Sequence, residues 1–165
     1  MVKTVRRKRS RWAPILQGCM AGLAVLFLLM GVMFDRGFML SCFLMTGLYF
    51  LYQNLSVKEF EYEMEGSSLV IDEIIGNKMR KTVLEADLGE LIVCAPNDSA
   101  RVDSYRRSAG SRIKKYDFTS RDPEIPYETM ILRVDGEEQK FLVEMDEEML
   151  TRMKQRYPDK VVRRG

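Results

Sequence analysis

Two long apolar segments near the start of the chain dominate its pattern of hydrophobic and polar residues. Segments 12–34 and 37–57 contain no charged residue, and only Asp35 and Arg36 separate them. At about 1.5 Å per residue, helices of these lengths reach roughly 34 and 31 Å, enough for a hydrocarbon core of about 30 Å. The pattern therefore predicts a transmembrane helical hairpin over 12–57, followed by a polar domain.

A signal peptide is the alternative interpretation of the first apolar segment, because basic residues precede it. The segment is longer than the usual apolar region of a signal peptide, about 7–15 residues, and no small-x-small cleavage site leads into a polar start. A second apolar segment also follows at once. We therefore favour two membrane helices, with Trp12 and Tyr52 as interfacial aromatic residues at the same membrane surface.

A basic leader, 1–11, precedes the hairpin and contains no acidic residue. Its cations favour the cytoplasmic side, which places both chain ends in the cytoplasm and the connecting turn outside. We therefore expect a multi-pass protein of the cell inner (plasma) membrane. The leader can also bind anionic headgroups, at about 1 kcal/mol per cation near the surface, so membrane lipids are expected partners. Its basic residues are Lys3, Arg6, Arg7, Lys8, Arg9 and Arg11.

Small residues in the first helix indicate a second interaction surface. Gly18 and Gly22 have the G-x-x-x-G spacing at which membrane helices approach closely, and Gly37 and Ser41 repeat the small-residue spacing. Two interpretations stay open: ordinary small residues, or a homo-oligomer formed through Gly18 and Gly22.

Residues 58–157 show the period-two alternation of half-buried strands. In the first strand, apolar residues alternate with four glutamates, which we interpret as a solvated sheet face rather than a cation site. Glycine-containing turn signals, the strongest being Asp135-Gly136, separate several strands. The expected strands are 58–65, 69–75, 78–84, 91–95, 113–119, 127–134 and 138–145.

After residue 145 the period changes to that of an amphipathic helix. Asp146 is the predicted N-cap, and acidic residues in the first turn and basic residues later complement the helix dipole. Pro158 ends the helix, and 158–165 is expected to be a flexible tail. We expect the apolar face of this helix to close one end of the sheet.

The most basic part of the domain lies between the fourth and fifth strands. We expect a loop there with one short helical turn. Its cations either contact an anionic surface or an acidic partner, or are simply solvated. The candidate contact residues are Arg106, Arg107, Arg112, Lys114 and Lys115.

No constellation for chemistry is apparent. The chain has no histidine, and its three cysteines are isolated, so we expect no catalytic, cofactor-binding or metal site. An enzyme would have to act through carboxylates such as Asp72, Asp87 or Asp117, brought together in one deep pocket. Nucleic acid is not an expected partner, because residues 58–165 carry more acidic than basic residues and would repel phosphates.

Seven antiparallel strands followed by one amphipathic helix resemble the pleckstrin-homology-like (PH-like) fold, a bent barrel closed at one end by that helix. With two N-terminal membrane helices, the order is similar to small bacterial membrane proteins with PH-like domains, a Firmicute-type family. The resemblance covers 12–157 and includes the stretches KEFEYEMEGSSLVIDEIIG and ILRVDGEEQKFLVEMDEEML. It implies a membrane-anchored α+β protein with a PH-like cytoplasmic domain over 58–157.

Phosphoinositide-binding PH domains bind phosphates through a basic first hairpin loop. We place 65–68 at that loop, and it is short and acidic, so no binding residues are carried over. The expected function is a non-catalytic membrane-anchored interaction or scaffold module at the cytoplasmic face of the membrane, with a protein partner. The alternative is an accessory subunit of a transport or envelope complex that binds through its transmembrane hairpin.

Overall fold

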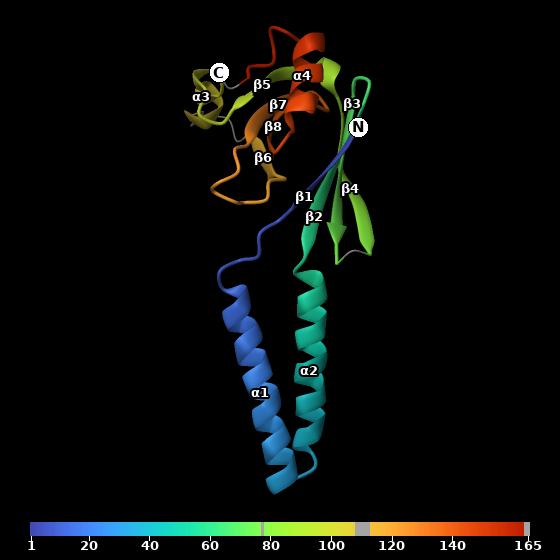
Figure 1. Cartoon of the computed structure of the whole chain (residues 1–165), viewed down its shortest axis with the longest axis vertical. Coiled ribbons are helices and arrows are strands. Elements are labelled where there is room, and N and C mark those ends of the chain that lie inside the picture. The colour runs from blue at the N-terminus through green and yellow to red at the C-terminus, as the bar shows by residue number, and fades with distance from the viewer. Residues whose placement is uncertain (77, 108–112, 164–165) are drawn as a thin grey trace. The chain divides into compact units, whose positions relative to one another are not determined.

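The computed structural model describes residues 1–76, 78–107 and 113–163, and the chain forms two compact units (Figure 1). The first unit is discontinuous in sequence because the helix pair is inserted between the first and second strands of the domain, and the second unit is discontinuous because it includes a short segment between the third and fourth strands. The first unit comprises Met1–Arg7, Glu59–Ile74 and Arg80–Gly165, and the second comprises Lys8–Lys58 and Ile75–Met79.

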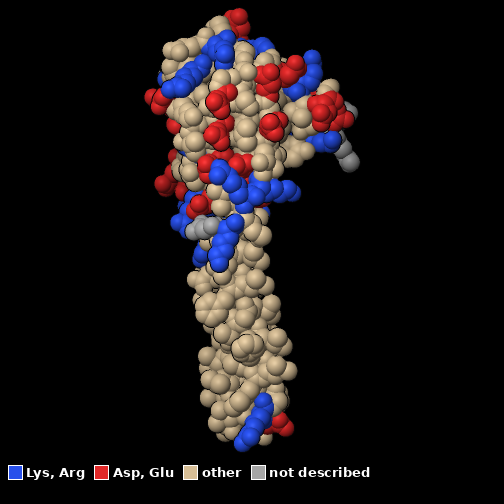
Figure 2. Space-filling model, turned by 90° about the vertical axis from the view of Figure 1, so that its right-hand side faces the viewer, with Lys and Arg blue, Asp and Glu red and all other residues tan. Residues whose placement is uncertain are grey.

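The second unit contains an antiparallel pair of helices, α1 (Ala13–Met33) and α2 (Phe38–Leu55). Both helices are long and apolar enough to span a membrane, and most of their large apolar side chains are exposed. On the face shown in Figure 2, no charged side chain interrupts the middle of the pair. In the connecting loop, Asp35 Oδ1 accepts a 2.6 Å hydrogen bond from the Gly37 backbone N–H. The helices lie within the two apolar segments that the sequence predicted.

α1 and α2 are in tight contact at Gly31. A Cβ atom there would lie 2.8 Å from Met39 Cγ and 3.2 Å from Met39 N. At Gly18 and Gly22, by contrast, an added Cβ would meet nothing within 4 Å. The G-x-x-x-G spacing therefore lies outside the α1–α2 contact, and self-association through it stays a prediction.

A four-stranded sheet forms from both sides of the helix pair, in the order β1-β2-β3-β4. β1 pairs antiparallel with β2, with Val5 opposite Phe60, and both side chains are buried. Part of the segment that we treated as a leader is therefore a strand of the domain. The four strands are β1 (Val2–Arg6), β2 (Lys58–Glu65), β3 (Ser68–Ile75) and β4 (Met79–Asp87).

The pairing of β1 corrects one placement made from the sequence. The first hairpin of the sheet is β1–β2, and its connection contains the whole helix pair. Residues 65–68 join β2 to β3, so they form the second connection of this sheet and not its first. The error arose because this short strand has only two apolar residues, Val2 and Val5, and their spacing of three does not alternate.

A second four-stranded sheet has the order β5-β7-β8-β6. β7 pairs antiparallel with both β5 and β8, whereas β6 runs parallel to β8. The helix α3 (Ala100–Arg107) follows β5, and the short 3₁₀ helix η1 (Leu88–Glu90) precedes β5. The four strands are β5 (Leu91–Pro96), β6 (Lys114–Asp117), β7 (Glu128–Val134) and β8 (Glu137–Val143).

The expected closed seven-strand barrel is therefore wrong. The described residues form eight strands in two open sheets, with four α-helices rather than three. Two features were invisible in the local pattern: the strand before the helix pair, and the parallel pairing of β6. α3 replaces part of the expected loop because Val102 is buried against the second sheet.

The C-terminal helix α4 (Glu147–Arg156) packs on the apolar core that the two sheets share. Asp146 is its N-cap, and its Oδ1 accepts a 2.8 Å hydrogen bond from the Met149 N–H, as the sequence predicted. Met149 and Met153 are buried in the same cluster as Tyr62 and Phe141. This packing brings the solvent-facing side of α4 next to the turn between β2 and β3.

Candidate functional site

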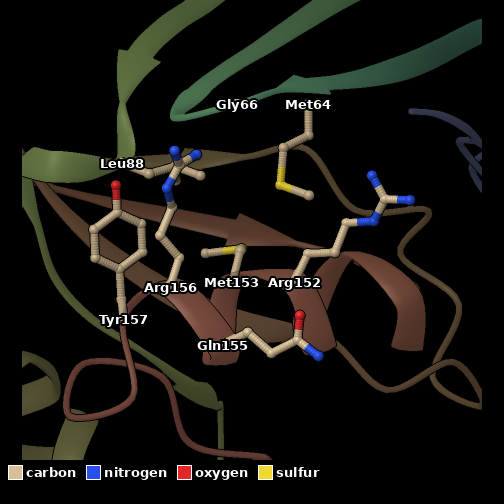
Figure 3. Close-up of a pocket in the computed structure, with 8 residues that line it drawn as sticks. All are labelled: Met64, Gly66, Leu88, Arg152, Met153, Gln155, Arg156 and Tyr157. Carbon is tan, nitrogen blue, oxygen red and sulfur yellow. The ribbon is translucent and has the colours of Figure 1, made fainter.

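A cavity of about 350 Å³ lies between α4 and the turn that follows β2 (Figure 3). This volume is near the lower end of the range for small-molecule pockets, about 300–1,000 Å³. Three separate parts of the chain form it, so only the folded domain contains it. The lining residues are Met64, Gly66, Leu88, Arg152, Met153, Gln155, Arg156 and Tyr157.

The floor of the cavity is apolar. Met64 on β2 is 7 % exposed, and Leu88 on η1 and Met153 on α4 are each 1 % exposed. Two of the three are methionines, whose flexible, polarisable thioethers adapt to differently shaped apolar groups. The floor is therefore apolar, and Met64 is the most exposed of its three side chains.

Two arginines form the rim. Arg152 and Arg156 are four residues apart on α4, so they lie on the same side of the helix. Figure 3 shows their guanidinium groups extending on either side of Met64 and Met153. At Gly66, where φ is +59°, an added Cβ would lie 3.8 Å from the Arg156 guanidinium. A glycine thus both permits the turn and leaves room beside the arginine.

The two arginines differ in their partners. Arg152 forms a 2.9 Å ion pair with Glu148, and both side chains are largely exposed. Among the residues that the structure describes, no carboxylate pairs with Arg156. The ammonium of Lys154 already binds carbonyl groups after the helix, including that of Val161 at 2.6 Å. Arg156 is therefore available to an anion at the rim.

Tyr157 forms the remaining wall of the cavity. The Lys160 ammonium lies 5.7 Å from the centre of its ring and donates a 3.0 Å hydrogen bond to the Gly89 carbonyl. These contacts hold the segment after α4 against η1. Among the described residues, no acidic one lines the cavity, so its chemistry is that of an apolar floor with a cationic rim.

A second polar cluster, outside the cavity, joins the two sheets. The Arg7 guanidinium donates a 2.6 Å hydrogen bond to the Asp117 carbonyl, and its carbon lies 5.0 Å from the centre of the Phe60 ring. Burial lowers the pKa of Arg7, and the neighbouring charge of Arg121 acts in the same direction. These contacts are all with residues of the domain itself, so we interpret Arg7 as a structural residue.

Asp117 is the acidic centre of this cluster. Its Oδ1 accepts hydrogen bonds from the Thr119 N–H at 3.1 Å and the Thr119 hydroxyl at 2.7 Å, and its Oδ2 accepts one from Arg121 at 2.9 Å. Burial opposes the charged form, but these hydrogen bonds and the charge of Arg7 outweigh it, so the pKa of Asp117 lies below its ordinary value.

The three carboxylates considered for catalysis lie apart, each with its own partner. Asp72 binds Arg80 at 2.6 Å, and Asp87 accepts a hydrogen bond from the Gly89 N–H at 2.8 Å. None of them lines the cavity beside α4. Within the described part of the chain, no group of three His, Cys, Asp or Glu residues could hold a metal ion.

The basic residues proposed as a contact surface are only partly described. Arg112 lies outside the described residues, and Arg106 and Arg107 end α3 with side chains that are not described. Lys114 and Lys115 are on β6 and exposed. A 3.0 Å hydrogen bond to Glu137 raises the pKa of Lys114. Binding of an anionic surface by this group stays a prediction.

We missed the cavity when reading the sequence. The spacing of Arg152 and Arg156 around Met153 was visible, but we assigned these cations to the helix dipole alone. Nothing in the local sequence indicated that the turn at Gly66 or Leu88 would lie opposite them.

The chain matches the family model described as Bacterial PH-like domain (DUF6106) over residues 2–163. The match starts at β1 and extends past α4, so it includes the strand before the helix pair. No curated protein and no solved structure matches the chain.

Proposed function

Because the chain belongs to this family of bacterial PH-like domains, we propose that it is a membrane-anchored, non-catalytic interaction module. PH-like domains are generally non-catalytic, and the described residues form a cavity with a cationic rim. The proposed binding site is that cavity, and a protein partner or a small ligand would occupy it.

The membrane assignment rests on the length and apolar character of α1 and α2, and the pairing of β1 with β2 carries the proposed topology. These strands precede α1 and follow α2, respectively, and they exchange backbone hydrogen bonds along the sheet. If both helices cross a bilayer, the chain must leave and re-enter on the same side for this pairing to form. An even number of crossings follows, and the PH-like domain forms on the side of both chain ends.

We place that side in the cytoplasm. Lys8, Arg9, Arg11 and Lys58 lie next to the ends of the helix pair, without an acidic residue among 8–11. The connecting loop has one acidic and one basic residue. The positive-inside rule therefore favours cytoplasmic chain ends and an external loop in a multi-pass protein of the inner (plasma) membrane.

Reporter fusions to the full chain test this arrangement. A reporter that is active only in the cytoplasm should be active when fused before Met1 or after Gly165. A reporter active only outside should be active when inserted between Asp35 and Arg36. The proposal would be contradicted if the two terminal reporters were found on opposite sides of the membrane. Release of the protein from membranes by alkali would also contradict it.

The accessory-subunit hypothesis remains as a second candidate because Gly18 and Gly22 lie outside the α1–α2 contact, so another helix could approach α1 there. Affinity purification from mild detergent distinguishes the two hypotheses with full-length variants. If the Arg156→Gln variant loses a partner and the double variant Gly18→Ile with Gly22→Ile retains it, the domain binds that partner. The opposite result supports binding by the hairpin.

A further inference from the structure

We propose that the cavity beside α4 binds a carboxylate carried by a short apolar group. The inference rests on the proposed function as a binding module and specifies the chemistry of its ligand. A free short-chain carboxylic acid and the C-terminal residue of a polypeptide both present this chemistry. The apolar group would lie on Met64, Leu88 and Met153, with the carboxylate at the arginine rim.

The charge of the rim favours a monoanion. Arg156 has no acidic partner among the described residues, and Arg152 shares its charge with Glu148. The rim therefore carries about one uncompensated positive charge, which one carboxylate would neutralise. The exposed pair between Arg152 and Glu148 is weak, so Arg152 can turn to the ligand at little cost.

The geometry of the rim also suits a carboxylate. A guanidinium presents parallel N–H groups that match the two oxygens of a carboxylate, and its hydrogen bonds to an anion are charge-assisted. Figure 3 shows the guanidinium of Arg156 between the apolar floor and the turn at Gly66. A Cβ atom at position 66 would be in van der Waals contact with this guanidinium, at 3.8 Å.

The size and polarity of the floor limit the apolar part. A cavity of about 350 Å³ with an apolar floor holds a chain of a few carbons, and the lining has no acid to repel the carboxylate. A neutral ligand of the same length would leave Arg156 without a partner. Charge and apolar contact together should therefore distinguish an acid from the corresponding alcohol.

Calorimetric titration of the intact protein in a neutral maltoside detergent tests the proposal. The probes are sodium hexanoate and 1-hexanol, which both partition into detergent. A second pair of probes is the peptide acetyl-Ala-Ala-Leu with a free carboxyl group and the same peptide with an amidated carboxyl group. We expect hexanoate or the free-acid peptide to bind at least tenfold more tightly than its neutral counterpart, and more weakly as salt is added. The tighter of the two acids identifies the source of the ligand.

Full-length variants assign the binding to the rim. Arg156→Gln should weaken binding of the acid about tenfold, and Arg152→Gln should weaken it less. Arg133 is an exposed arginine on β7, and Arg133→Gln is the control that should leave binding of the acid within twofold. Equal binding by hexanol and hexanoate, or unchanged binding by Arg156→Gln, would overturn the proposal. Either result would leave the reporter-fusion test of membrane topology unaffected.

A measurement on the wild-type protein removes dependence on the variants. With methionine methyl groups labelled with carbon-13, hexanoate should shift the Met64 and Met153 resonances, and hexanol should not. If these two resonances respond equally to acid and alcohol, the cavity does not recognise a carboxylate.

Discussion

The phenolic hydroxyl of Tyr62 on β2 donates a 2.7 Å hydrogen bond to the carbonyl of Phe118, the residue that follows β6. This bond links the first sheet to the second, and the Tyr62 side chain is fully buried. The Glu144 backbone N–H approaches the same hydroxyl oxygen at 3.5 Å. Burial raises the pKa of Tyr62 far above its ordinary value, so the hydroxyl remains a neutral donor.

Replacing Tyr62 with phenylalanine should destabilise the domain without changing its shape. The substitution leaves the buried Phe118 carbonyl without its donor, which costs about 1–3 kcal/mol. Denaturant unfolding of the full-length protein, followed by near-UV circular dichroism, measures the change. Tyr116→Phe is the matched control, because Tyr116 is on β6, close to Phe118 in the chain, and is 39 % exposed. Equal effects of the two substitutions would show that the bond contributes little.

Arg6 and Arg7 are adjacent in one basic run, but their substitutions should have different effects. Arg7→Gln removes a hydrogen bond to Asp117 and the contact with Phe60, so we expect a loss of about 2 kcal/mol. Arg6 makes only a 3.3 Å ion pair with Glu59 from a largely exposed side chain, so Arg6→Gln should cost less than about 0.5 kcal/mol. Urea unfolding of both variants checks this, and a larger effect of Arg6→Gln would contradict it.

This contrast explains why β1 could not be predicted. The run from Val2 to Arg6 has one fully inward apolar position, Val5, and its charges are the usual signal for a cytoplasmic leader. The partner strand follows the helix pair, more than fifty residues later. Strand pairing over that distance does not produce a periodic pattern in the local sequence. Only the folded structure therefore distinguishes the internal role of Arg7 from the exposed position of Arg6.

Elements fixed by local chemistry were predictable. Asp146 caps α4, and the turn at Asp135-Gly136 has positive φ at both residues, as its sequence indicated. The apolar lengths of α1 and α2 were equally clear. The cavity was not, because its floor and rim come from β2, η1 and α4, and no single segment shows that they meet.

Stability should fall in acid partly because of Asp117. Its pKa in the folded state is below the ordinary value of 3.8, so its contribution is present above pH 3.8 and lost as the pH falls through the folded pKa. Asp117→Asn should lower stability at pH 7 by about 1–2 kcal/mol, since hydrogen bonds to a charged group are lost. It should also flatten the decline below pH 4. Asp135→Asn in an exposed turn is the control, and an unchanged acid decline in Asp117→Asn would contradict the assignment.

Cys94 should react with thiol reagents only when the domain unfolds. The side chain is fully buried on β5, and burial, with the nearby Glu128, raises the pKa of the thiol to about 12. In a full-length chain with Cys19→Ala and Cys42→Ala, maleimide labelling at pH 8 should be slow in buffer and complete in denaturant. Tyr116→Cys added to that background supplies an accessible thiol. Rapid labelling of Cys94 under native conditions would show that β5 opens locally.

The packing of α1 on α2 should depend on Gly31 and not on Gly18. A side chain at Gly31 would collide with Met39, including its backbone nitrogen, so Gly31→Leu must push the helices apart near their connecting loop. Overpacking of this kind costs about 1–3 kcal/mol. Gly18→Leu places the same side chain on the same helix where nothing lies within 4 Å, so the helix pair should tolerate it. Each variant is unfolded by adding dodecyl sulfate to the protein in neutral detergent micelles. Circular dichroism follows the unfolding and compares the two variants. If Gly18→Leu is the more damaging substitution and also changes the oligomeric size, α1 uses its G-x-x-x-G surface for a contact with another helix.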